Sequence, residues 1–150
     1  MNWDATCYVV DTNTLTQLSR PQRATDLFHQ SVRIPRAVLA EASGLPDIDE
    51  LTALEYRTTP SVLRCLIAIL ETVPPTDTDL LDLYKNLGNA DPFLVACALD
   101  GREKEQGSLF PRAWIVVTDD GAARKKAEEF ELVTLSNQEF AERILTGMSA

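Results

Sequence analysis

The sequence predicts an α/β fold, a three-layer sandwich in which a central parallel sheet of four or five strands lies between two layers of helices. The chain has 150 residues, of which 45% are hydrophobic, so we expect one domain, residues 1–150, with a substantial core. Its short apolar runs lack polar alternation, which is typical of strands buried on both faces. Segments with helix signals separate these runs, as in a parallel sheet with crossover helices.

Four short runs are predicted to be strands because they are rich in β-branched and aromatic residues. The clearest of them is Trp114–Val117, which runs directly into a polar segment. In chain order the four are Cys7–Val10, Val32–Ile34, Trp114–Val117 and Leu132–Leu135.

The intervening segments carry helix signals. Pro35 opens a predicted helix over Arg36–Ser43, and Gly44 follows it as a stop signal. Ser61–Glu71 is apolar nearly all round, which predicts a helix that is buried or half-buried against a partner, although Ile67–Val73 could also form a strand. The other predicted helices span Thr14–Ser19, Asp47–Tyr56, Asp77–Leu87, Phe93–Leu99, a segment marked by Ala123, Ala127 and Phe130, and Asn137–Leu145. Gly101–Pro111 is predicted to be a polar loop.

The composition favours a soluble cytoplasmic protein with no membrane contact. The N-terminus lacks a basic region followed by an apolar core, so no signal peptide is expected. No apolar stretch approaches the roughly 20 residues that span a bilayer. Cys7, Cys65 and Cys97 are odd in number and lack zinc-like pairing, which argues against a disulfide framework.

The net charge of −9 would repel a nucleic acid unless basic residues cluster locally. Such clusters exist at Arg20, Arg23, Arg33 and Arg36, and at Arg124–Lys126. A groove formed by Arg20, Arg23, Arg36 and Lys125 could bind a phosphate backbone. The alternatives are a solvated face or a surface for an acidic partner.

Four acidic residues are placed to meet at one edge of the predicted sheet. Asp11 and Asp120 follow two strands, at the carboxyl ends where ligands bind in open α/β sheets. Asp91 opens a helix, and Glu41 lies on a partly apolar side of the helix after the second strand. Converging carboxylates need a cation, and an all-oxygen set suits Mg²⁺ or Mn²⁺. Zinc would require more histidine or cysteine than the lone His29 supplies.

Each of these acids also has an ordinary structural explanation. Asp11 and Asp91 are good helix caps, Asp120 with Gly121 is a common turn pair, and Glu41 suits any helix surface. Taken singly, no residue identifies a site.

In their order and spacing, however, the four segments resemble the motifs of the PIN-domain family. Asp11-Thr12-Asn13 after a buried strand resembles the family's opening motif, and the helix begun by Pro35 that carries Glu41 resembles its second. Asp91 at the start of a small-residue helix and Thr118-Asp119-Asp120 after a strand resemble the third and fourth. The matched segments are Val9–Leu15, Ile34–Glu41, Asn89–Ala98 and Ile115–Asp120.

The resemblance implies a PIN-like fold in which Asp11, Glu41, Asp91 and Asp120 bind the metal. Asn13 and Thr118 would support them through hydrogen bonds, and Asp119 could replace Asp120. It also implies a metal-dependent endoribonuclease, and the length is typical of VapC-like toxins, with RNA as substrate and an antitoxin as possible partner. The alternative is a PIN-like scaffold that binds RNA or protein without cutting.

Two other acidic α/β classes are excluded by particular residues. A haloacid-dehalogenase-type phosphatase needs an aspartate two residues after the first, where this chain has Asn13. A receiver domain needs paired acids early and a lysine at the end of a late strand, and neither is present. No Ser-His-Asp or Cys-His arrangement is apparent, since His29 is the only histidine.

The apolar helix over Ser61–Glu71 also predicts an interface. Leu63, Leu66, Ile67, Ile69 and Leu70 cover more of a helix than one buried face requires. We therefore expect a homodimer, or an antitoxin segment, to cover the helices between Asp47 and Glu71. The alternative is a helix central to the core.

Overall fold

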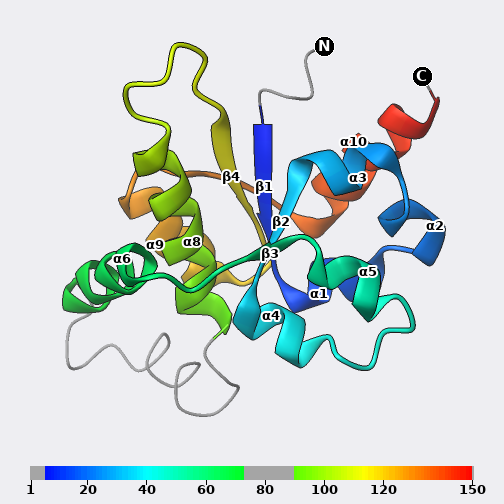
Figure 1. Cartoon of the computed structure of the whole chain (residues 1–150), viewed down its shortest axis with the longest axis horizontal. Coiled ribbons are helices and arrows are strands. Elements are labelled where there is room, and N and C mark those ends of the chain that lie inside the picture. The colour runs from blue at the N-terminus through cyan, green and yellow to red at the C-terminus, as the bar shows by residue number, and fades with distance from the viewer. Residues whose placement is uncertain (1–5, 73–89, 150) are drawn as a thin grey trace.

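The computed structural model describes residues 6–72 and 90–149 and confirms the predicted three-layer α/β fold. A single five-stranded, all-parallel sheet has the strand order β3-β2-β1-β4-β5. Figure 1 views this sheet nearly edge-on, with α6, α8 and α9 on one face and α1–α5 and α10 on the other. The strands are β1 (Thr6–Val10), β2 (Val32–Pro35), β3 (Glu55–Tyr56), β4 (Ala113–Val117) and β5 (Val133–Leu135).

Except for α10, the helices of the first layer are shorter than those of the second. The first layer holds α1 (Thr12–Gln17), α2 (Arg20–Arg23), α3 (Asp26–Ser31), α4 (Arg36–Glu41), α5 (Ile48–Thr52) and α10 (Asn137–Ser149). The second holds α6 (Pro60–Glu71), α8 (Ala90–Lys104) and α9 (Gly121–Glu129). The predicted helix Asp77–Leu87 lies outside the described residues. Within them, no helix is long and apolar enough to cross a bilayer.

The apolar strand runs are explained by burial on both faces of the sheet. In β1, Tyr8 and Val10 pack into the core of the first layer, and Val9 packs into the core of the second. Side chains alternate between the faces of a strand, so both sets of positions must be apolar in a central strand.

Two predictions place the end of a segment wrongly, and one alternative to a correctly predicted helix fails. The predicted helix Asp47–Tyr56 ends early, because Glu55–Tyr56 forms β3 and pairs with the end of β2. The strand alternative for Ile67–Val73 fails, because α6 continues to Glu71. The predicted loop Gly101–Pro111 starts too early, because α8 runs on to Lys104 and residues 101–104 are helical.

Gly101 lies in this unpredicted part of α8, where the Trp114 indole packs against it. A Cβ added at Gly101 would lie 2.5 Å from the nearest ring atom, far inside van der Waals contact. We expect Gly101→Ala to lower the free energy of unfolding by about 1–3 kcal/mol through overpacking, despite alanine's better helix propensity. Thermal melting would measure the loss.

Gly147→Ala in α10 is the matched control for this prediction. The added Cβ would meet Leu27 Cδ2, the free end of a flexible side chain that can turn away. The control should therefore match or exceed the wild-type melting temperature. Equal melting temperatures for the wild type and Gly101→Ala would contradict the tight Gly101–Trp114 contact.

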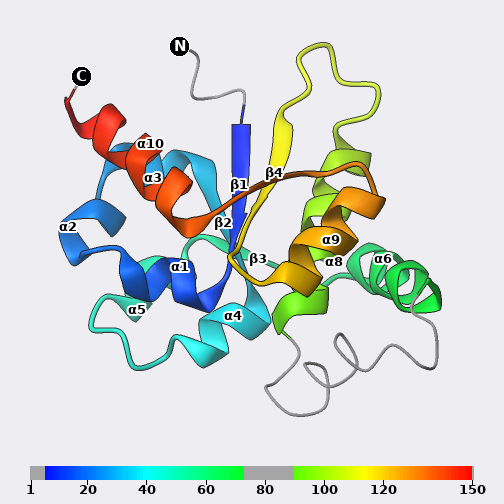
Figure 2. The same ribbon diagram turned by 180° about the vertical axis from the view of Figure 1, so that it is seen from behind.

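The strand order places a switch point between β1 and β4. β2 and then β3 lie on one side of β1, and β4 and then β5 lie on its other side. Ligands of open α/β sheets bind outside the carboxyl ends of the strands at such a point. Figure 2 shows the start of α1 and the link from β4 to α9 together at this end of the sheet.

Candidate functional site at the carboxyl edge of the sheet

Two of the predicted acidic segments meet at the switch point. Val10 and Val117, the last residues of β1 and β4, are register partners, so Asp11 and Thr118 leave neighbouring strands side by side. Asp119 and Asp120 follow directly. We call this region the acidic edge.

Asp11 is buried and held by three hydrogen bonds. Its Oδ1 accepts from Thr14 N (2.8 Å) and Thr14 Oγ1 (2.7 Å), and its Oδ2 accepts from Thr118 Oγ1 (2.5 Å). An ionised carboxylate has about four lone-pair positions. These bonds occupy both positions on Oδ1 and one on Oδ2, so Asp11 can offer one further ligand, a fixed lone pair on Oδ2. The capping role is also realised, because Asp11 is the N-cap of α1.

Thr14 and Asn137 belong to this cluster although neither was predicted. Both are buried, and Thr14 Oγ1 lies 2.6 Å from the Asn137 amide oxygen, while Asn137 Nδ2 has no partner among the residues described. Thr14 has one hydroxyl proton, which the acceptor-only Asp11 carboxylate requires. The O and N atoms of an amide are assigned from their hydrogen bonds. Exchanging the two amide atoms of Asn137 places Nδ2 beside Thr14 Oγ1 and gives it a partner. In that orientation Asn137 donates to Thr14, and Thr14 donates to Asp11.

Glu41 reaches the same edge from α4. Thr12 Oγ1 donates to Glu41 Oε2 at 2.8 Å, and Thr12 is the residue next to Asp11. Glu41 is solvent-exposed, so the expectation of a partly apolar setting is wrong. The reason is its position as the last residue of α4, where the helix ends at the edge of the domain.

The two adjacent aspartates after β4 point to different elements. Asp120 is the N-cap of α9, since its Oδ1 accepts from Ala123 N (2.8 Å), and its own N donates to Thr118 Oγ1 (3.1 Å). Asp119 is exposed, and its Oδ1 accepts from Asn137 N (2.9 Å). Each keeps Oδ2 without a hydrogen bond to the described residues, so either carboxylate can still supply a ligand.

The supporting residues predicted from the resemblance divide into two cases. Thr118 donates a hydrogen bond to Asp11 Oδ2. Asn13 does not support the acidic edge in this way. Its side chain is exposed and makes no hydrogen bond to the described residues, and only its backbone carbonyl is engaged, by Thr16.

Convergence of four carboxylates remains a prediction. Asp91 is the second residue of α8, and its side chain lies outside the described part of the structure. Among the side chains that are described, no three acidic, histidine or cysteine residues form a group able to hold a metal ion. The donor chemistry of the acidic edge is all oxygen, which fits Mg²⁺ or Mn²⁺.

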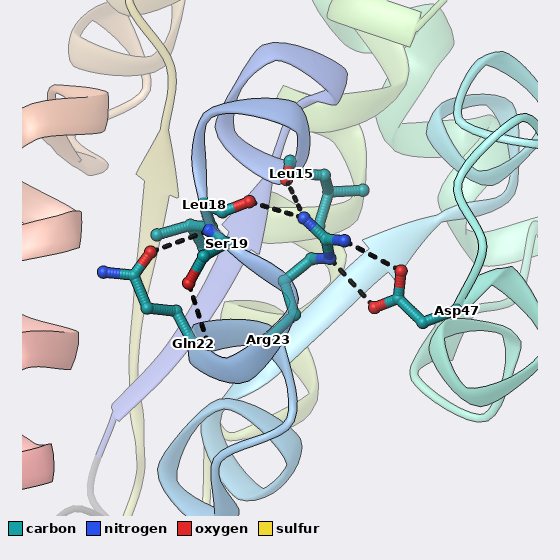
Figure 3. Close-up of polar contacts among 6 residues, drawn as sticks. All are labelled: Leu15, Leu18, Ser19, Gln22, Arg23 and Asp47. Carbon is teal, nitrogen blue, oxygen red and sulfur yellow. Dashed lines mark hydrogen bonds and ion pairs between the residues drawn. The ribbon is translucent and has the colours of Figure 1, made fainter.

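Arg23 is wrong as a nucleic-acid contact. It is buried, and its Nε and Nη2 donate to both carboxylate oxygens of Asp47, while Nη1 donates to the carbonyls of Leu15 (2.9 Å) and Leu18 (2.5 Å) (Figure 3). The Ser19–Gln22 capping box beside it starts α2 and directs Arg23 inward (Figure 3). By contrast Arg20, Arg36 and Lys125 are exposed.

Comparison with known proteins assigns no family. No protein-family model matches the chain, and no curated protein matches it with significant similarity.

Proposed function

We propose that the protein is a metal-dependent endoribonuclease of the PIN-domain type, with Asp11, Glu41, Asp91 and Asp120 holding Mg²⁺ or Mn²⁺. One observation carries the proposal. The Asp11 carboxylate is buried at the switch point, oriented by Thr14 and Thr118, and left with one open lone pair on Oδ2. A capping role alone would need only the bond from Thr14 N.

The neighbouring residues have distinct tasks in this proposal. Thr14 and Thr118 fix the direction of Asp11 Oδ2, and Thr12 holds Glu41 beside the first turn of α1. A divalent ion bound there lowers the pKa of a water molecule and stabilises charge on a phosphodiester. Exposed Arg36, at the start of α4, offers a cation for the RNA backbone at the same edge of the sheet.

The direct test is cleavage of mixed-sequence single-stranded RNA with Mn²⁺ and with a chelator. We expect fragments with Mn²⁺ and none with the chelator. Binding of RNA without cleavage under both conditions would overturn the proposal and favour the non-catalytic scaffold. The same assay with DNA of matching sequence tests the preference for RNA, which rests on the family resemblance.

Millimolar Mn²⁺ is expected to raise the melting temperature. A ligand present at a hundred times its dissociation constant stabilises the native state by about 2.7 kcal/mol. For a chain of this length that corresponds to roughly 5–10 °C. Asp91→Ala with Asp120→Ala should abolish the shift.

A control with the same change in charge is Asp49→Ala with Glu50→Ala, because both residues are exposed on α5. This variant should keep the Mn²⁺ shift. A wild-type melting curve that Mn²⁺ leaves unchanged would show that the acids do not share an ion.

We further propose that this is the cytoplasmic toxin of a toxin–antitoxin pair and that it forms a homodimer through α6. Leu66 and Ile69 are buried in the second core, whereas Leu63 and Ile67 are 42% and 57% exposed. The exposed pair, four residues apart, forms one stripe that a second copy would cover. An antitoxin is the alternative occupant.

Light scattering is expected to give the mass of a dimer for the wild type and of a monomer for Leu63→Glu with Ile67→Glu. Leu109→Glu with Phe110→Glu is the control, because these residues are 89% and 88% exposed on the loop between α8 and β4. The control variant should remain dimeric. A monomeric wild type would rule out the homodimer.

A further inference from the structure

A cavity of about 450 Å³ lies away from the acidic edge, between the sheet and the carboxyl end of α8. Its lining includes Arg33 of β2, Tyr56 of β3, Arg57, Lys104 of α8 and Trp114 of β4. Trp114 precedes Thr118 by four strand residues, or about 13 Å. The cavity is therefore separate from the acidic edge, and its size is typical of a small-molecule site.

The cavity carries unpaired positive charge in an acidic protein. Lys104 is paired with Asp100 (3.0 Å), and the lining residue Glu105 with Arg112 (3.8 Å). Arg33 and Arg57 have no carboxylate partner among the described residues, and Glu55 is the one lining acid left to oppose them. The unpaired charges on the wall thus sum to a positive value although the whole chain carries −9.

Arg33 is held in place for binding an anion. Its Nη1 donates to its neighbour's carbonyl, Val32 O (2.6 Å), and contacts His29 O (3.4 Å). Val32 and Ile34 point into the first core, so Arg33 points to the opposite face, towards α8. Its Nε and Nη2 make no hydrogen bond to the described residues, and a guanidinium fork matches the oxygens of a phosphate.

The other wall of the cavity is aromatic. The Tyr56 and Trp114 rings meet edge to face with centroids 5.6 Å apart, and Tyr56 is fixed by a hydrogen bond to buried Asp100. Trp114 Nε1 is buried without an acceptor among the described residues, whereas buried donors are usually paired. Lys104 Nζ lies over the Tyr56 ring, 5.7 Å from its centroid. The remaining surface of the two rings makes this wall aromatic.

We propose that this cavity binds a nucleotide-sized phosphate ester with a planar ring. Arg33 and Arg57 hold the phosphate, and the ring lies against the Tyr56–Trp114 wall. The two arginines alone would suit an acidic peptide equally well. The aromatic wall and the cavity volume favour a ligand that carries a ring beside its anionic group. The proposal does not depend on the metal site or on RNA cleavage.

Isothermal titration calorimetry of the full chain with AMP and with UMP tests this proposal. We expect saturable binding that Arg33→Gln with Arg57→Gln weakens by about tenfold or more. Arg143→Gln, which removes an exposed arginine of α10 in the other layer of helices, should leave the affinity unchanged. Melting curves would verify that each variant is folded.

Fluorescence supplies an independent reading, because Trp3 and Trp114 are the two tryptophans of the chain. In a Trp3→Phe variant, AMP should change the Trp114 emission with the same affinity that calorimetry gives. Absence of binding, equal affinity in the Arg33/Arg57 variant, equal affinity for adenosine and AMP, or binding of an acidic peptide but not of AMP would each overturn the proposal.

Discussion

Arg23→Met is expected to lower the free energy of unfolding by about 3–5 kcal/mol, because it leaves the Asp47 carboxylate buried without its partner. The two side chains are only 5% and 8% exposed, and the guanidinium also satisfies the Leu15 and Leu18 carbonyls at the end of α1. The expected fall in melting temperature is roughly 6–20 °C. Calorimetry and denaturant unfolding would measure it.

The double variant Arg23→Met with Asp47→Leu is the control. Replacing both members of a buried ion pair by apolar residues is often nearly neutral. In the double variant the Leu15 and Leu18 carbonyls still lose their donor. We therefore expect a loss in the free energy of unfolding that is smaller than the loss in Arg23→Met. A loss below about 1 kcal/mol in Arg23→Met would mean that water reaches Asp47.

The same pair makes stability depend on pH in a defined direction. The hydrogen bonds from Arg23 lower the pKa of Asp47, against the opposing effect of burial. A lowered folded-state pKa gives stability that is fully present above the unfolded value of about 3.9 and is lost as the pH falls through the folded value. The stability difference between the wild type and Arg23→Met should therefore shrink in strong acid.

Asp11→Asn is expected to abolish metal-dependent cleavage, with a loss of about 10²-fold or more, while the fold survives. The amide keeps the shape of the side chain and an oxygen that can accept from Thr14. It removes the negative charge and puts a nitrogen where Oδ2 offers its free lone pair. RNA cleavage and the Mn²⁺ melting shift should disappear together.

Asp11→Ser separates this role from helix capping. Serine is as good an N-cap as aspartate but has no carboxylate, so this variant should also be folded and inactive. Wild-type cleavage in either folded variant would exclude Asp11 as a ligand. Asp119→Asn and Asp120→Asn, compared in the same assay, would identify the fourth ligand.

The layers of the fold could be predicted because the central strands are apolar on both faces. Tyr8, Val9 and Val10 show this pattern, and it depends only on local sequence. β3 could not be predicted in the same way. Glu55 and Tyr56 carry no apolar run, and they become a strand only because Ile34 and Pro35 present an edge to pair with. α8 likewise continues past Gly101, against which the Trp114 ring packs.

The acidic edge was predictable close to the strand ends, because Asp11 directly follows β1 and Asp120 lies three residues after the end of β4. The residues that hydrogen-bond to these acids were harder to predict. Thr14 had a local signal, since a residue three positions after an N-cap lies within its reach. Asn137 had none, because 123 residues separate it from Thr14. Arg23 looked like a surface charge for the same reason, since Asp47 is 24 residues further on.

The pairing of β1 with β4 has a consequence for how the protein forms in the cell. Residues 6 and 113 are register partners, so 107 positions of chain separate the two strands of the central pair. At the usual speed of protein synthesis, roughly 5–20 seconds pass between the appearance of these strands. During that interval one edge of β1 stays unpaired, and Asp11 lacks Thr118. A nascent chain thus carries an incomplete acidic edge until most of its length has been made, and the distant pairing makes the sheet slow to assemble.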